Sequence, residues 1–162
     1  KLIIEPGRSI AGNAGILLAT VQYVKSNGEK TFVISDAAMN DLIRPALYEA
    51  HHEIWPTRTG YLPPCEERPN SAQHQKETTD LIPSDIVGPV CETGDFFAKD
   101  RLIPEVLRGE RLAVFSCGAY GFTMSSTYNS RPRAAEVLVD GHNWYEIRRR
   151  ETWKDLIALE TL

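Results

Sequence analysis

Short apolar runs closed by turn-forming residues are the feature of this sequence that most constrains its fold. The runs are rich in Val, Ile, Leu and Thr, and Gly, Pro and Asn separate them. Two of the breaks, Ser26-Asn27-Gly28-Glu29 and Asp140-Gly141-His142-Asn143, have the composition of hairpin turns. A succession of short strands joined in this way is typical of barrels and sandwiches. We therefore predict a mainly β fold, a β-barrel or sandwich.

The elements can be predicted by residue range. Strands are expected at residues 2–4, 16–25, 31–35, 52–55, 85–90, 111–116, 134–139 and 144–148. Helical turns are expected at residues 9–14, 42–48, 122–126 and 151–159, the last with Thr152 as its N-cap. We expect Pro45 to interrupt the second of these turns.

Residues 56–84 differ in composition from the rest of the chain. They include Pro56, Pro63, Pro64, Pro69 and Pro83, which is half of the ten prolines, and they are mostly polar. No periodicity of a strand or a helix is present there. We predict a long surface insertion with weak order, whose deletion leaves the fold intact.

Charge, hydropathy and cysteine usage exclude several function classes. The formal net charge is −4, and the basic cluster Arg148-Arg149-Arg150 is flanked by acids, which argues against a nucleic-acid role. No apolar run reaches the ~20 residues that a membrane-spanning helix needs. The cysteines Cys65, Cys91 and Cys117 form no C-x-x-C pair. They suit a reducing compartment, and we expect a cytoplasmic protein.

Two turns contain residues suited to binding or proton transfer. Glu5-Pro6-Gly7-Arg8 exposes backbone N–H groups beside a guanidinium, which suits a phosphate or a carboxylate. A plain surface turn is the alternative. In Cys91-Glu92-Thr93-Gly94-Asp95 the acidic neighbours favour the thiol form of Cys91, which could then donate a proton. A buried core cysteine is the alternative there.

Two further groups are candidates for ligand binding. In Gly118-Ala119-Tyr120-Gly121 the glycines allow a tight bend that presents Tyr120, although a packing aromatic fits equally well. Arg44 and Tyr48 are four residues apart, so on a helix they share one face and could grip an anion. Solvated side chains are the alternative. Histidines and cysteines fit no zinc spacing, and we predict no metal site.

Taken in order, five stretches of the chain resemble the diaminopimelate decarboxylase family of fold-type III pyridoxal-phosphate (PLP) enzymes, in its C-terminal part. They are Glu5-Pro6-Gly7-Arg8-Ser9, residues 36–48, residues 87–95, Gly118-Ala119-Tyr120-Gly121 and residues 128–137. Relatives in the same superfamily decarboxylate ornithine, arginine or carboxynorspermidine. The resemblance implies PLP as the cofactor and a carboxy-lyase that converts meso-diaminopimelate to L-lysine and CO₂.

The resemblance also implies a division of the chain. Residues 1–15 would be the end of an N-terminal (β/α)8 barrel, with Leu2–Ile4 as its last strand. Residues 16–162 would form the C-terminal β-barrel, which carries the insertion at 56–84. None of the six lysines resembles the one that holds the cofactor, so that lysine would lie in the missing barrel domain. We therefore expect this chain, as a fragment, to be inactive by itself.

The family's roles carry over residue by residue. Glu5, Gly7 and Arg8 would border the PLP phosphate, and Tyr120 would pack at the cofactor. Cys91 would be the catalytic proton donor, reaching across the interface of a homodimer into the partner's site.

Substrate binding is implied for Arg8, Arg44, Tyr48, Glu92 and Tyr120. Arg44 and Tyr48 would hold the distal carboxylate and Glu92 the distal ammonium. Ornithine has no distal carboxylate, so Arg44 favours diaminopimelate. A related ornithine, arginine or carboxynorspermidine decarboxylase, a non-catalytic binding or regulatory protein that kept the fold, and a β-barrel interaction module remain the alternatives.

Overall fold

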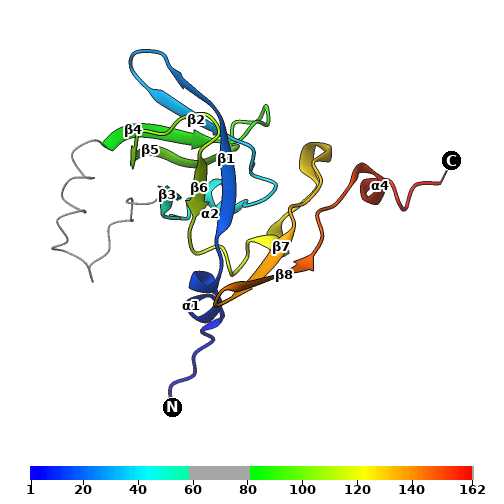
Figure 1. Cartoon of the computed structure of the whole chain (residues 1–162). Helices are drawn as coiled ribbons and strands as arrows, with labels where there is room; N and C mark the ends of the chain where they lie inside the picture. Colours follow the sequence, from blue (N-terminus) through cyan, green and yellow to red (C-terminus); the bar gives the residue numbers. More distant parts are fainter. Residues whose placement is uncertain (59–80, 162) are drawn as a thin grey trace.

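The computed structural model describes residues 1–58 and 81–161, and in them the chain is mainly β (Figure 1). A six-stranded sheet has the strand order β3-β6-β1-β2-β4-β5. Its members are β1 (Leu17–Ser26), β2 (Thr31–Ser35), β3 (Ile54–Pro56), β4 (Leu81–Val87), β5 (Phe96–Pro104) and β6 (Arg111–Val114). The two outer strands, β3 and β5, also contact each other, so the sheet curls into a nearly closed barrel. The predicted mainly β, barrel-like fold is confirmed.

Strand β1 is long enough to serve both halves of this sheet. Residues 17–20 pair with β6, and residues 21–26 pair with β2, with an irregularity between Val21 and Tyr23. A bulge of this kind bends a strand and increases its twist. The strand therefore forms a corner at which the sheet turns, as closure of a small barrel requires.

The interior of the barrel is filled by alternate side chains of these strands. Strand β6 contributes Leu112 and Val114, which are almost completely buried, and β2 contributes Val33. Other members of the same core cluster are Ala19, Val21, Leu42, Ile54, Ile86, Phe97 and Ile103. Apolar burial on this scale is the main stabilising term of a domain of this size.

The chain after the barrel forms a separate hairpin. Strands β7 (Glu136–Asp140) and β8 (Asn143–Arg148) form a two-stranded sheet of their own among the described residues, and they join at the predicted turn, where Gly141 has φ 58°. Helix α4 (Trp153–Leu156) follows, and Thr152 and Asp155 cap it reciprocally. In Figure 1 the hairpin lies below the barrel, with one end near α1, and α4 extends away to the right.

The N-terminal segment before β1 contains a short helix and a stretch without regular structure. The predicted helical turn is confirmed as α1 (Gly7–Ala11) and the 3₁₀ turn η1 (Gly12–Ala14). The strand predicted at Leu2–Ile4 as the end of a barrel outside this chain stays a prediction; in this chain these residues have no regular structure and their side chains are exposed. A strand needs a neighbour for its backbone hydrogen bonds, and no strand in the described ranges pairs with them.

The expected limits of the insertion at 56–84 are also wrong. Pro56 ends β3, and residues 81–84 belong to β4, where Ser84 is buried. The middle of the insertion lies outside the described residues. Strand β5 was not predicted, because the charged triplet Lys99-Asp100-Arg101 hides its pattern and Asp100 has φ 50°. Pairing with β4 along most of its length overrides that local signal.

The turn after β6 approaches the N-terminal segment at the level of the backbone. Cys117 N–H donates to Gly15 O (2.8 Å), and Gly118 N–H donates to Gly12 O (3.0 Å). A Cβ built on Gly118 would lie 2.1 Å from Ala11 O and 2.7 Å from Gly15 N. Only glycine fits here, because backbone atoms cannot move aside as a flexible side chain can.

We expect Gly118→Ala to destabilise the fold by about 1–3 kcal/mol, since the added methyl group overpacks a backbone contact. Thermal unfolding of the purified chain measures this. Gly12→Ala is the matched control, because a Cβ on Gly12 would meet only Arg8 Cγ, at 3.7 Å. Equal unfolding temperatures for the two variants would contradict the close contact at Gly118.

Candidate functional site

Arg44 is presented by a short helix that begins with it. Helix α2 (Arg44–Tyr48) has Arg44 and Pro45 in its first turn, where proline is tolerated because the first N–H groups have no helical partner. The expectation that Pro45 interrupts this turn is wrong for that reason. The helix ends at Glu49, which has the left-handed φ of 52°. Arg44 is 9% exposed although it carries a charge.

Two tyrosines flank the Arg44 guanidinium. Its Cζ lies 5.4 Å from the ring centre of Tyr48 and 5.4 Å from that of Tyr120. Tyr48 is four residues further along the same helix face, as the spacing predicted. Tyr120 comes from the turn after β6, where it has φ 59°. We call Arg44, Tyr48 and Tyr120 the arginine–tyrosine cluster. Cation–π attraction stabilises a partly desolvated charge in this arrangement.

No carboxylate neutralises Arg44 within the part of the chain that the structure describes. Ion pairs do form at Arg58, Arg101, Arg131, Arg133, Arg148 and Arg149. A buried cation without an anionic partner is unfavourable, so this position is suited to receive an anion from outside the chain.

His52 is a buried residue close enough to Arg44 to feel its charge. Its Nδ1 donates to Phe115 O (2.8 Å), which leaves Nε2 buried and without a hydrogen-bond partner. Burial lowers the pKa of His52, and the positive charges of Arg44 and Arg8 lower it further. The imidazole is therefore neutral, and it adds no positive charge to the cluster.

Glu5, Gly7 and Arg8 lie in and before α1, at the surface. The first N–H groups of α1 receive no side-chain cap, and a Cβ on Gly7 would meet nothing within 4 Å. Free N–H groups, open space and the Arg8 guanidinium together fit an anionic group such as a phosphate. The contact of Gly118 with Ala11 connects this segment to the turn that carries Tyr120.

Cys91 and Glu92 lie in the loop between β4 and β5, which Asp95 holds. The buried Asp95 carboxylate accepts the N–H groups of Met39 (2.7 Å) and Val90 (2.6 Å). Gly94, in the same loop, packs close to the Met39 side chain: a Cβ placed on Gly94 would lie 3.3 Å from Met39 Cε. The loop is therefore fixed against the segment that leads into α2.

Both predicted residues of this loop are exposed. Cys91 is a free thiol, and the alternative of a core cysteine is wrong. Glu92 accepts the Thr93 N–H on Oε1 (2.9 Å) and the Tyr128 hydroxyl on Oε2 (3.0 Å). Within the described ranges, no hydrogen bond or ion pair joins Cys91 or Glu92 to the arginine–tyrosine cluster. The structure brings together Arg44, Tyr48 and Tyr120, and leaves Cys91 and Glu92 on an adjoining loop.

Four residues that support the site were not singled out from the sequence for this purpose: Asn40, His52, Asp95 and Tyr128. Asn40 is buried, and its side chain bonds Ser126 O and the Arg131 guanidinium. Asp95 had a usable signal, since an acid that closes a glycine turn often accepts nearby N–H groups. The other contacts join segments far apart in the sequence and left no local pattern.

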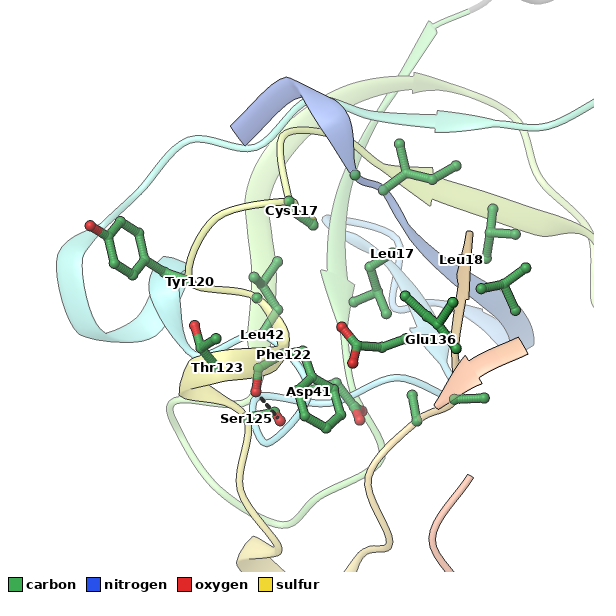
Figure 2. A pocket seen from close by; sticks show the side chains of 18 of the residues that line it. Leu17, Leu18, Asp41, Leu42, Cys117, Tyr120, Phe122, Thr123, Ser125 and Glu136 are labelled. Carbon is green, nitrogen blue, oxygen red and sulfur yellow. Dashed lines mark hydrogen bonds between the residues drawn. The ribbon is translucent and has the colours of Figure 1, made fainter. Parts of the chain in front are cut away.

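A cavity of about 580 Å³ lies beside the site (Figure 2). Leu17 and Leu18 of β1, Phe122 and the hairpin line it, and Tyr120 stands at its edge with the ring directed away from these apolar residues. Arg8, Arg44 and Glu92 do not line this cavity, whose charged lining residues are Asp41, Glu136 and Arg150. Among the described residues, no three potential metal ligands come together, and no helix has the length and hydropathy to cross a membrane.

Comparison with known proteins decides the family. A family model described as the pyridoxal-dependent decarboxylase, C-terminal sheet domain, matches residues 9–118. The chain belongs to this family. The matched residues include the barrel strands, α2 and the loop with Cys91 and Glu92.

Relatives extend the similarity over almost the whole chain. A diaminopimelate decarboxylase of Aquifex aeolicus is 54% identical over 157 residues, which is 97% of this chain and 33% of the relative. One of Pseudomonas aeruginosa is 52% identical over 161 residues, 99% of this chain and 34% of the relative. The chain thus spans about a third of the length of these relatives.

A solved structure agrees with the fold of the sheet domain. Diaminopimelate decarboxylase from Helicobacter pylori, complexed with L-lysine, superposes with a TM-score of 0.77 at 41% identity. The match covers 94% of this chain and 33% of that one.

We expect His52 to make the stability of the sheet domain depend on pH. Its folded pKa is lowered from the usual 6.5, so the unfolded chain takes up a proton that the folded chain resists. The free energy of unfolding should therefore fall as the pH decreases below about 6.5. His52→Asn, whose amide can still donate to Phe115 O, should reduce this slope in denaturant unfolding.

His142→Asn, at the exposed hairpin turn, is the control and should keep the wild-type slope. An unchanged slope in His52→Asn would contradict the burial of a neutral imidazole.

Proposed function

We propose that this chain is the C-terminal part of a PLP-dependent carboxy-lyase that converts meso-diaminopimelate to L-lysine and CO₂. The observation that carries the proposal is Arg44, a buried cation between Tyr48 and Tyr120 without a carboxylate partner in the described ranges. The names of the relatives support the same reaction.

The distal end of diaminopimelate carries an ammonium and a carboxylate, and both must be matched where water is excluded. Arg44 offers the cation for the carboxylate, and Tyr48 adds a hydroxyl from the same helix face. Glu92 offers the anion for the ammonium. A substrate with only one distal charge would leave Arg44 or Glu92 unpaired, which costs several kcal/mol in a desolvated site.

The residues present fit the anionic part of PLP. Gly7 and Arg8 would bind its phosphate through N–H groups and a guanidinium, with Glu5 beside them and Tyr120 packing at the cofactor. When bound, PLP supplies the electron sink for decarboxylation. The covalent lysine would lie outside this chain, because none of the six lysines stands in a stretch that resembles the family's cofactor-binding lysine.

Cys91 is proposed as the proton donor for the carbon that loses CO₂. Its support is the exposed thiol on a loop that the Asp95 carboxylate holds rigidly. An exposed position suits a residue that reaches across a homodimer interface into the partner's site. The chain's own contribution is then to hold the substrate and deliver one proton.

The proposal includes the organisation of the whole protein. An N-terminal (β/α)8 barrel would precede residue 16, with residues 1–15 as its end, and two copies would share their sites. The share of the relatives that the chain covers supports an additional domain. A cytoplasmic location is proposed with it, and the free thiols of Cys91 and Cys117 suit a reducing compartment.

A non-catalytic binding module with the same fold is the alternative. Borohydride reduction of the full-length protein followed by mass spectrometry separates the two. A PLP–lysine adduct supports the enzyme, and its absence from protein supplied with PLP contradicts it.

We expect Arg44→Ala in the full-length enzyme to lower kcat/KM for diaminopimelate about a hundredfold. Removing one partner of a buried charge pair costs about 2–5 kcal/mol, and each tenfold corresponds to about 1.4 kcal/mol. Rates on lysine and ornithine, which lack the distal carboxylate, should be low and nearly unchanged. Steady-state CO₂ release measures all three substrates.

Arg108→Ala, at an exposed turn before β6, is the matched control and should leave all rates unchanged. An equal loss on all three substrates would show that Arg44 serves the fold or the cofactor, and the assignment to diaminopimelate would lose its physical support.

We expect Cys91→Ala to lower kcat much more than it raises KM, because proton donation acts in the transition state and not in ground-state binding. Single-turnover measurements on the full-length enzyme test this. An unchanged kcat would show that Cys91 does not donate the proton.

A further inference from the structure

A hydrogen bond joins the side chains of Tyr128 and Glu92, which are 36 residues apart in the sequence. The Tyr128 hydroxyl donates to Glu92 Oε2 at 3.0 Å. Tyr128 stands in the 3₁₀ turn η4 (Tyr128–Ser130), and the proposed function gives it no role toward the substrate or the cofactor.

The two oxygens of Glu92 are bound from different sides. Oε2 accepts the Tyr128 hydroxyl, and Oε1 accepts the Thr93 N–H at 2.9 Å. Both donors are neutral, and together they hold the carboxylate at each of its two oxygens. An ionised carboxylate has about four lone-pair directions, so each oxygen retains acceptor capacity for a cation.

The turn that carries Tyr128 is itself firmly supported. The Tyr128 N–H donates to Ser126 Oγ (3.3 Å), and Ser126 N–H donates to Asn40 O (2.9 Å). Asn40 is 2% exposed, and its amide returns a bond to Ser126 O (3.2 Å). Arg131, just after the turn, donates to Asn40 Oδ1 (2.9 Å).

The backbone of η4 is held in a conformation that residues other than glycine seldom adopt. Asn129 has φ 58° and Ser130 has φ 54°. Such positions persist when the surrounding contacts hold them, and they concentrate at functional sites. Hydrogen bonds therefore hold both segments that meet in the Tyr128–Glu92 bond: Asp95 binds the Glu92 loop to Met39, and Asn40 binds the turn of Tyr128.

We propose that Tyr128 is a positioning residue that orients Glu92 toward the distal ammonium of the substrate. The inference rests on the proposed function, because it takes Glu92 as the group that binds this ammonium. A carboxylate already held in its binding orientation loses less conformational freedom when the substrate arrives. The bond to Glu92 also raises the pKa of Tyr128, so the hydroxyl stays protonated and remains a donor.

The test is Tyr128→Phe in the full-length holoenzyme, with two substrates. Diaminopimelate has the distal ammonium, whereas 2-aminopimelate keeps the distal carboxylate and lacks the ammonium. We expect kcat/KM for diaminopimelate to fall about tenfold, mainly through KM, as for a lost hydrogen bond to a charged group. The lower rate on 2-aminopimelate should be unchanged, which a purely structural role of Tyr128 would not produce.

Two variants complete the kinetic test. Tyr23→Phe, at an exposed position of β1, is the matched control and should behave as the wild type on both substrates. In a Glu92→Gln background the further effect of Tyr128→Phe should be small, because the two side chains act as a unit. An equal loss on both substrates, or no loss on diaminopimelate, would overturn the role of Tyr128.

A spectroscopic measurement tests the contact without enzyme activity. Carbon-13 labelling of tyrosine Cζ follows the ionisation of Tyr128 by NMR, and Glu92→Gln should lower its pKa, since removal of the negative charge favours the phenolate. An unaltered Tyr128 titration overturns the contact. Absence of CO₂ release from diaminopimelate by the wild-type holoenzyme contradicts the proposed function itself, while an altered titration would still establish the contact.

Discussion

The backbone contact between Gly15 and Gly118 is the constraint on which the arrangement of the site depends. Two hydrogen bonds join these segments, and a Cβ on either glycine would lie within 3 Å of the opposing backbone. Because backbone atoms cannot give way, the segment with Arg8 and the turn with Tyr120 have one relative position. Tyr120 in turn flanks Arg44, so α1, the turn after β6 and α2 are placed together by one contact.

The electrostatics of the site follow from the burial of the Arg44 charge without a carboxylate partner in the described ranges. Arg44 is desolvated, its neighbours are the rings of Tyr48 and Tyr120, and the nearby His52 is held neutral. The rings offset part of the cost of the buried charge, and an anionic ligand would offset the rest. Proteins retain such locally unfavourable arrangements mainly where they serve binding or catalysis.

Contacts within a few residues were predictable at the site, and contacts between distant segments were not. The four-residue spacing of Arg44 and Tyr48 predicted a shared helix face, and the structure confirms it. The glycines around Tyr120 predicted a tight bend, which the close approach at Gly118 bears out. The hydrogen bond of Tyr128 to Glu92 joins residues 36 positions apart, and that of Arg131 to Asn40 joins residues 91 positions apart. No local sequence pattern predicts such pairs.

The sequence by itself determined the mainly β class, most strands and both hairpins, because these depend on local periodicity and turn chemistry. Tertiary structure decided the rest. Strand β5 forms despite its charged centre because β4 supplies its hydrogen bonds, whereas residues 2–4 are apolar and form no strand because none in the described ranges pairs with them. The barrel closes because β1 changes partner at a bulge. A strand is stable only when a neighbouring strand supplies its hydrogen bonds, and which strands become neighbours is set only when the whole sheet assembles.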